Sequence, residues 1–172
     1  MKTFDRESLM TIVLLAITAI AVAVQADVST QSRDSVVGTW KLVSASASTA
    51  DGRLIDAPFG LSPTGVITYT PEGRMMAMIS YGGRKRLSGD RVSSPAPERA
   101  DAFATFFAYA GRYAVNGDNV VHHVEISSVQ NWVNTDMVRL VKFDGDRITL
   151  RTPPLSVGGT TLATDLVWER VK

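Results

Sequence analysis

Two adjacent histidines are the side chains in this sequence best suited to chemistry. His122 and His123 lie in the segment 119–127, which alternates as a β-strand does, so the two side chains must point to opposite faces. The face that carries His122 is otherwise apolar, with Val120, Val124 and Ile126. We therefore expect His122 to face the interior and His123 the solvent, although a shift of one residue in register would exchange them.

A buried imidazole at position 122 has two possible roles. It could act as a general acid or base or hold a ligand, and it could equally be a structural residue that hydrogen-bonds a core tyrosine or arginine. Two consecutive histidines on a regular strand cannot chelate one ion, and the sequence has no cysteine. We therefore expect no metal, no haem and no other cofactor.

Further candidate ligand contacts are aromatic side chains with a polar tip, one arginine and one methionine. Residues of these types orient small molecules in mostly apolar pockets. Arg139 could bind a carboxylate from inside the protein, or could pair with Glu125 at the surface. Met76 belongs to a methionine cluster that could adapt to ligands or simply fill the core. The candidates are Tyr69, Met76, Tyr109, Tyr113, His122, Trp132 and Arg139.

The amino-terminal segment has the order of a secretory signal. Basic residues precede an apolar run over residues 9–24, and Val24-Gln25-Ala26 offers compact residues for a signal peptidase. Residues 1–26 are therefore predicted to be a signal peptide and 27–35 a polar leader, with an uncleaved anchor as the alternative. Cleavage would leave an exported, periplasmic or extracellular protein with no stable membrane span.

The remaining residues, 36–172, are enough for one domain. The formal net charge of the chain is +1, so the sequence lacks the excess of basic residues that is typical of nucleic-acid-binding proteins. No disulfide can form without cysteine, so the core and a closed sheet must supply the stability. The sequence carries no Gly-x-Ser-x-Gly elbow and no phosphate-binding glycine loop.

Most of the domain follows the pattern of short β-strands joined by tight turns. Three hairpins are predicted from apolar or β-branched runs around short glycine-containing loops. They cover residues 65–80, 111–127 and 135–152, and a strand over 160–171 closes the chain. Such a series favours an all-β, up-and-down antiparallel barrel of about eight strands, whose interior is just wide enough for side chains or one small ligand.

One segment breaks the strand pattern. Residues 97–110 are rich in alanine, and Phe103, Phe106, Phe107 and Ala110 recur at helical spacing. With Pro97 suited to the first turn and Gly111 to the end, we expect one mid-chain helix. Its phenylalanine stripe is expected to cap one end of the barrel.

Four short motifs together resemble the bacterial lipocalin-like domain family. They are Gly38-Thr39-Trp40-Lys41-Leu42-Val43-Ser44, Ala108-Tyr109-Ala110-Gly111-Arg112-Tyr113, Val121-His122-His123-Val124-Glu125 and Leu166-Val167-Trp168-Glu169-Arg170. The resemblance implies a lipocalin-type barrel with an internal apolar cavity. It also implies that Trp40, after Gly38, closes one barrel end by packing against Arg170.

These observations lead to one main hypothesis and two alternatives. The main hypothesis is an exported protein that binds a small hydrophobic or amphipathic molecule in its barrel, with no cofactor and no catalysis. The first alternative is a small isomerase or cyclase in which His122 transfers protons. The second is a barrel whose interior is filled by its own side chains and which acts as an envelope interaction module.

Overall fold

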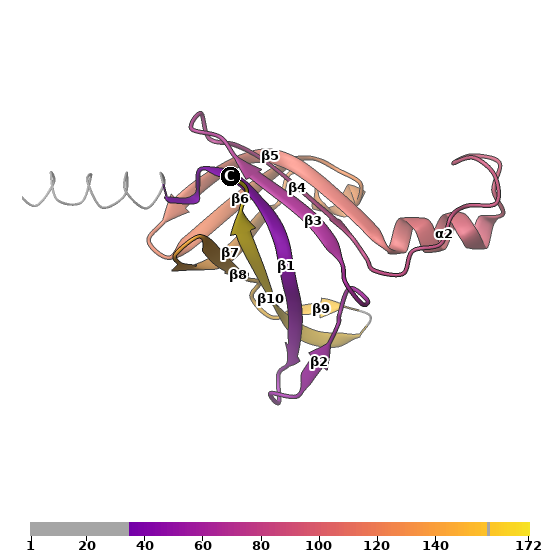
Figure 1. The fold of residues 1–172 in the computed structure, drawn as a ribbon, viewed down its shortest axis with the longest axis horizontal. Coiled ribbons are helices and arrows are strands. Elements are labelled where there is room, and N and C mark those ends of the chain that lie inside the picture. Colours follow the sequence, from indigo (N-terminus) through magenta and orange to yellow (C-terminus); the bar gives the residue numbers. More distant parts are fainter. Residues whose placement is uncertain (1–34, 158) are drawn as a thin grey trace, which may run out of the picture.

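The computed structural model describes residues 35–157 and 159–172. The predicted signal peptide lies outside the described residues, as does the polar leader except for Ser35. The described chain consists mainly of strands wound around one interior, with the carboxyl terminus at the opposite side of the barrel from the helix (Figure 1).

The elements follow one another in an order dominated by hairpins. The strands are β1 (Gly38–Thr49), β2 (Leu54–Asp56), β3 (Thr64–Tyr69), β4 (Arg74–Ser80), β5 (Phe106–Asn116), β6 (Asn119–Ser127), β7 (Asp136–Asp144), β8 (Arg147–Arg151), β9 (Leu155–Val157) and β10 (Thr160–Arg170). The helical elements are α2 (Ala96–Ala104) and the short 3₁₀ turn η1 (Gln130–Trp132).

Pairing of the first and last long strands closes the sheet into a barrel. Neighbouring strands are antiparallel in the order β1-β3-β4-β5-β6-β7-β8-β10, and β10 pairs back with β1 from Trp40 opposite Arg170 to Thr49 opposite Leu162. The short strands β2 and β9 add to the margins of β1 and β10. The predicted eight-stranded, up-and-down lipocalin-like barrel is thus confirmed.

Alternation along the strands places the core inside the barrel. In β4, Met75, Ala77 and Ile79 are buried, whereas Met76 and Met78 are exposed on the outer face. The same alternation in β6 buries Val120, His122 and Val124. A side-chain period of two therefore fixes which residues can reach a molecule inside the barrel.

One end of the barrel is closed by a tryptophan and an arginine. Trp40 is fully buried, and its indole N–H donates to the backbone oxygen of Val36 at 2.8 Å. The Arg170 guanidinium lies over the Trp40 ring at 4.0 Å from the centroid and donates to the backbone oxygens of Val37 and Ser35. Gly38 has φ +133°, and a Cβ there would lie 2.5 Å from the Arg170 guanidinium, so only glycine fits this approach.

The predicted helix over 97–110 is wrong in its second half. The helix α2 ends at Ala104, and Phe106 and Phe107 begin the long strand β5, where successive side chains point to opposite faces. Tertiary pairing outweighs local helical spacing here, since β5 is hydrogen-bonded between β4 and β6 along its length. The helix has no buried residue and extends from one end of the barrel (Figure 1).

Gly111 lies within β5 and does not end a helix. A register shift occurs between Ala110 and Gly111, and a Cβ on Gly111 would collide with the backbone oxygen of His123 on β6. This bulge also turns Ile126 outwards, where it is 69% exposed, instead of inwards with His122. The predicted shared face of His122 therefore ends at Val124.

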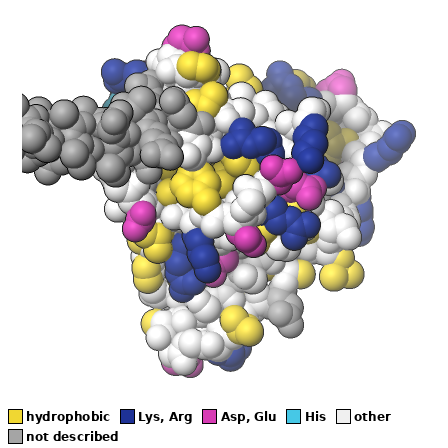
Figure 2. Space-filling model, turned by 60° about the vertical axis from the view of Figure 1, so that its left-hand side comes forward, with side chains coloured by type: hydrophobic (Ala, Val, Ile, Leu, Met, Phe, Trp, Pro, Cys, Tyr) yellow, Lys and Arg dark blue, Asp and Glu magenta, His cyan; other side chains and the backbone are white. Residues whose placement is uncertain are grey.

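Charges of both signs are intermixed on the outer surface. Figure 2 shows basic and acidic side chains interspersed on one face, with hydrophobic ones in small groups between them. The ion pairs on this surface include Lys41 with Glu169 and Arg151 with Asp165, both across neighbouring strands. Within residues 35–157 and 159–172, no helix is long and apolar enough to cross a membrane.

Candidate ligand-binding site

The barrel encloses a cavity of about 580 Å³ that opens at the end opposite Trp40 and Arg170. Strands from both sides of the barrel line it, together with η1 and the end of α2. Its walls are mostly apolar, and Ala77, Leu150 and Leu166 are examples of buried lining residues. The cavity rules out the alternative of a barrel filled by its own side chains.

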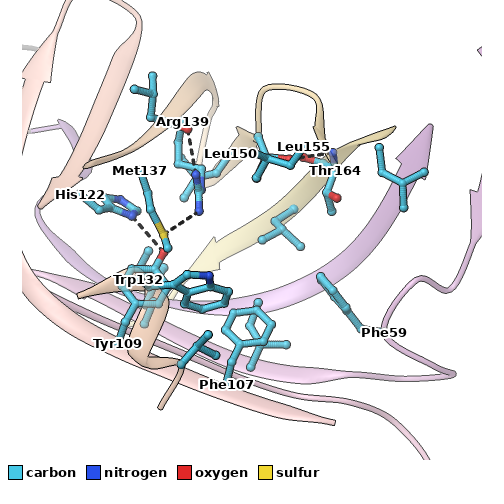
Figure 3. Close-up of a pocket in the computed structure, with 18 of the residues that line it drawn as sticks. Phe59, Phe107, Tyr109, His122, Trp132, Met137, Arg139, Leu150, Leu155 and Thr164 are labelled. Atoms are coloured by element: carbon cyan, nitrogen blue, oxygen red, sulfur yellow. Dashed lines mark hydrogen bonds between the residues drawn. The ribbon is translucent and has the colours of Figure 1, made fainter. Parts of the chain in front are cut away.

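Aromatic rings form a continuous series from the cavity opening towards its inner end. The ring centroids of Phe59 and Phe107 are 5.9 Å apart, those of Phe107 and Trp132 are 5.5 Å apart, and those of Trp132 and Tyr109 are 6.0 Å apart. All three contacts are edge-to-face, which is a favoured geometry for aromatic pairs. Figure 3 shows Phe107, Trp132 and Tyr109 side by side along one part of the cavity.

His122 lies at the inner end of this series and is held by two tyrosines. It is fully buried, its Nε2 is 2.8 Å from the Tyr69 hydroxyl oxygen, and its Nδ1 is 3.0 Å from the Tyr109 hydroxyl oxygen. His122 and Tyr109 both line the cavity. His123 lies on the outer face of the same strand, where its Nδ1 is 2.8 Å from Asp136 Oδ1.

Burial keeps the imidazole and the two phenols uncharged. Loss of hydration and, to a smaller extent, the positive charge of Arg139 together lower the pKa of His122 to about 3. Burial raises the pKa of Tyr69 and of Tyr109, while the charge of Arg139 acts in the opposite direction on both. At neutral pH the group therefore consists of a neutral imidazole between two neutral hydroxyls.

Arg139 supplies the positive charge at this site. It comes from β7, lines the cavity, and is partly buried. Its guanidinium donates to the backbone oxygen of Val138 at 2.9 Å and contacts the Met137 sulfur at 3.4 Å (Figure 3). The suggested surface pairing with Glu125 is wrong, because Glu125 on the outer face binds Arg74 and Arg112.

The structure brings together four of the seven residues singled out in the sequence as ligand contacts. Tyr109, His122, Trp132 and Arg139 line the cavity. Tyr69 and Tyr113 are buried behind it, where Tyr69 supports His122 and the Tyr113 hydroxyl donates to the backbone oxygen of Thr70. Met76 is 50% exposed on the outer face, since alternation turns its neighbour Met75 inwards instead.

Sequence reasoning missed several lining residues. Phe107 had been assigned to a helix, and Phe59 lies in an irregular segment after Pro58 that carries no periodic signal. Met137 shares the inward face of β7 with Arg139, so alternation alone indicates it as a lining residue, whereas no candidate residue on β8 points to Leu150. Trp168 also lines the cavity, and its indole N–H is buried with no hydrogen-bond partner in the described part of the chain.

No acidic, histidine or cysteine cluster that could hold a metal ion occurs among residues 35–157 and 159–172. The polar groups that line the cavity include the Tyr109 hydroxyl, the His122 imidazole, the Arg139 guanidinium and the indole N–H of Trp168. This arrangement can surround an apolar body and hold one polar group of it by hydrogen bonds.

Three known proteins are similar to this chain to different degrees. The 4'-hydroxy-3'-methoxypropiophenone carrier protein of Aspergillus oryzae is 31% identical over 107 residues, which cover 56% of this chain and 96% of that protein. A lipocalin-like protein from Bacteroides uniformis is 13% identical, with a TM-score of 0.41 over 79% of this chain and 98% of that one. A protein from Bacteroides eggerthii gives 13% identity and a TM-score of 0.38 over 79% and 99%.

The family profile described as a lipocalin-like domain matches residues 37–171. The match spans the barrel from the strand that carries Trp40 to the one that carries Arg170. The chain therefore belongs to the lipocalin-like domain family.

Proposed function

We propose that this protein is a carrier that holds one small, largely apolar or aromatic molecule in its barrel cavity and releases it unchanged. The observation that carries the proposal is the cavity of about 580 Å³ with its series of aromatic rings. Pockets for small molecules are typically 300–1,000 Å³, apolar and equipped with a few polar groups.

The driving force for binding would be burial of apolar surface. Each Å² of apolar surface removed from water contributes about 25 cal/mol before the costs of association are subtracted. Phe107 and Trp132 are only partly buried, so a ligand packed against these two rings would cover ring surface that is otherwise exposed to the cavity. The relative in Aspergillus oryzae is itself named as a carrier of an aromatic ketone, which supports the same type of activity here.

Binding fits the site better than the alternative of an isomerase or cyclase. Both ring nitrogens of His122 are taken up by tyrosine hydroxyls, and its lowered pKa keeps the imidazole uncharged at neutral pH. A proton carrier works best when its pKa lies near the working pH and one nitrogen can reach the substrate. His122 meets neither condition, so we assign it a role in holding Tyr109.

The proposal is tested by filling the cavity from within. Ala77 is buried on β4 and lines the cavity, so Ala77→Phe places a ring in the space for the ligand. The control is Ala114→Phe, the same substitution at an exposed position of the neighbouring strand β5. Titration with the uncharged fluorophore N-phenyl-1-naphthylamine gives the dissociation constant of each protein.

We expect saturable binding of one fluorophore per chain to the wild type and to Ala114→Phe, and binding at least about 10-fold weaker to Ala77→Phe. Circular dichroism establishes that the variants keep the fold. Absence of saturable binding to the wild type would overturn the proposal, as would equal affinity of the two phenylalanine variants.

We further propose that the protein is exported with cleavage after Ala26, on the basis of the apolar run and the compact residues that precede Asp27. The intact mass of protein recovered from the envelope or medium of its own cells should match residues 27–172. A mass that includes residues 1–26 would contradict cleavage.

A further inference from the structure

The inner end of the cavity carries more polar side chains than a purely apolar ligand would need. Tyr109, His122 and Arg139 all line the cavity, and an aliphatic or purely aromatic ligand would offer no acceptor to the donors of Tyr109 and Arg139. We propose that this group binds an anionic oxygen, so that the ligand class is small aromatic acids with the ring towards Trp132. The inference rests on the proposed function, because it presupposes that the cavity holds a ligand.

The direction of the hydrogen bonds follows from the surroundings of Tyr69. A neutral imidazole has one donor and one acceptor nitrogen. His122 Nε2 is the hydrogen-bond partner found for the buried Tyr69 hydroxyl among the described residues. If Nε2 carried the proton, the Tyr69 O–H would be a buried donor without an acceptor, which is costly. Tyr69 therefore donates to Nε2, and the proton of the imidazole resides on Nδ1.

This tautomer determines what Tyr109 offers to a ligand. With the proton on Nδ1, His122 donates to the Tyr109 hydroxyl oxygen across 3.0 Å. The Tyr109 O–H is then not used by His122, and it belongs to a residue that lines the cavity. The chain of bonds from Tyr69 through His122 thus turns Tyr109 into a hydrogen-bond donor aimed at the ligand space.

Arg139 adds a positive charge that the protein itself does not balance. No ion pair between its guanidinium and a carboxylate occurs in the described part of the chain. Asp136, on the same strand, also lines the cavity, but its carboxylate is 2.8 Å from His123 Nδ1. Glu125, on the neighbouring strand β6, binds Arg74 and Arg112. A cation in an apolar cavity is stabilised most by an anion that hydrogen-bonds to it.

The two groups together select the chemistry of the ligand. Tyr109 and Arg139 both present donors, so an ammonium or a second donor finds no acceptor from them, whereas a carboxylate oxygen can accept from both. Trp132 packs edge-to-face on Tyr109, which places an aromatic wall directly beside these donors. A ring with an attached carboxylate matches this juxtaposition.

The test uses one ring system with three different side groups. The probes are 2-naphthoate, 2-naphthamide and 2-ethylnaphthalene, which share their aromatic body and differ in charge and in hydrogen-bond acceptors. Displacement of N-phenyl-1-naphthylamine at neutral pH gives their affinities for the protein. We expect 2-naphthoate to bind the wild type about 10- to 100-fold more tightly than 2-ethylnaphthalene, with 2-naphthamide in between.

Single substitutions test whether Arg139 and Tyr109 cause the preference for 2-naphthoate. Arg139→Met removes the charge while keeping an unbranched side chain, and Tyr109→Phe removes only the hydroxyl. The control is Arg112→Met, which removes an arginine on the outer face of β5. We expect Arg139→Met to abolish the preference for naphthoate over naphthamide, and Tyr109→Phe to weaken both by about 3- to 10-fold. Arg112→Met should bind all three probes within about 2-fold of the wild type.

The outcomes separate failure of this inference from failure of the proposed function. If 2-ethylnaphthalene binds and 2-naphthoate binds no more tightly, the carrier function stands and the anion site is wrong. The anion site is also wrong if Arg112→Met lowers naphthoate affinity as much as Arg139→Met does. If the fluorophore binds saturably and none of the three probes displaces it, the anion site is wrong; if the fluorophore itself does not bind the wild type, both proposals are overturned.

Discussion

The two ends of this barrel are built from the same aromatic residue types and yet have opposite properties. At the closed end Trp40 is fully buried, and the Arg170 guanidinium stacks on its ring while donating to two backbone oxygens. At the open end Phe107 and Trp132 are partly buried and face a cavity of about 580 Å³. At the closed end the aromatic ring is covered entirely by the protein itself, whereas at the open end part of the ring surface remains accessible to another molecule.

This difference indicates that the closed end contributes more to the stability of the fold than the open end does. Rings packed on all sides gain dispersion contacts, whereas rings that face an empty space forgo part of them. The two arginines follow the same division, because the Arg170 guanidinium lies over the Trp40 ring and donates to two backbone oxygens, while the Arg139 guanidinium lines the cavity. We interpret the closed end as structural and the open end as the site of function.

The largest expected effect is the contrast between two tryptophans. Trp40→Ala should lower the free energy of unfolding by about 3–5 kcal/mol, because it leaves a large void in a packed region. Trp132→Ala should cost less than about 2 kcal/mol, since the ring is partly exposed, but it should weaken N-phenyl-1-naphthylamine binding at least about 5-fold. Urea unfolding and fluorescence titration measure the two quantities, and equal stability losses would break the distinction between the ends.

The second expected effect concerns acid. The folded pKa of His122 is about 3, below the ordinary value of 6.5, so the folded protein binds fewer protons than the unfolded chain between these values. The stability associated with the neutral imidazole is complete above pH 6.5 and is lost as the pH falls towards 3. The loss amounts to about 1.4 kcal/mol per pH unit within this window.

Replacement of the titrating group isolates this effect from the protonation of carboxylates. His122→Gln keeps a donor and an acceptor for the two tyrosines but has no pKa in the window. Between pH 6.5 and 4.5 the wild type should lose about 2–3 kcal/mol more stability than His122→Gln. Parallel urea titrations at both pH values provide the measurement, and equal losses would show that His122 is not held neutral by burial.

The smallest expected effect is at Met76. Its side chain is 50% exposed on the outer face, so Met76→Ser should change the free energy of unfolding by less than about 0.5 kcal/mol. Fluorophore affinity should stay within about 2-fold of the wild type. A larger change in affinity would mean that the outer face of β4 takes part in binding, contrary to the comparison drawn here.

Much of the fold could be predicted from the sequence because the relevant signals are local. Hairpins such as the one that joins β3 and β4 are indicated by alternation on both sides of a short glycine-containing loop. The same alternation predicts that Met75 and Met76 face opposite sides, although it does not say which side is the interior. The barrel closure followed from the need to cover both edges of the sheet.

What could not be predicted depends on contacts between distant segments. Phe103, Phe106 and Phe107 have helical spacing, and only the pairing of β5 with β4 and β6 decides that the last two are in a strand. The bulge beside Gly111 depends on the close approach of the His123 backbone, which no single-segment pattern reveals. The contact of Tyr69 with His122 joins residues 53 positions apart, so the support of the site was likewise hidden.

The central claim is that the open end, and not the closed end, accommodates a ligand, and the three tryptophans report on it directly. We would record the indole N–H signals in nitrogen-15 NMR spectra during titration with N-phenyl-1-naphthylamine, assigning them with single Trp→Phe variants. We predict a saturable shift of the Trp132 signal and no change in that of Trp40. An unchanged Trp132 signal, or shifts of equal size at both ends, would contradict the account.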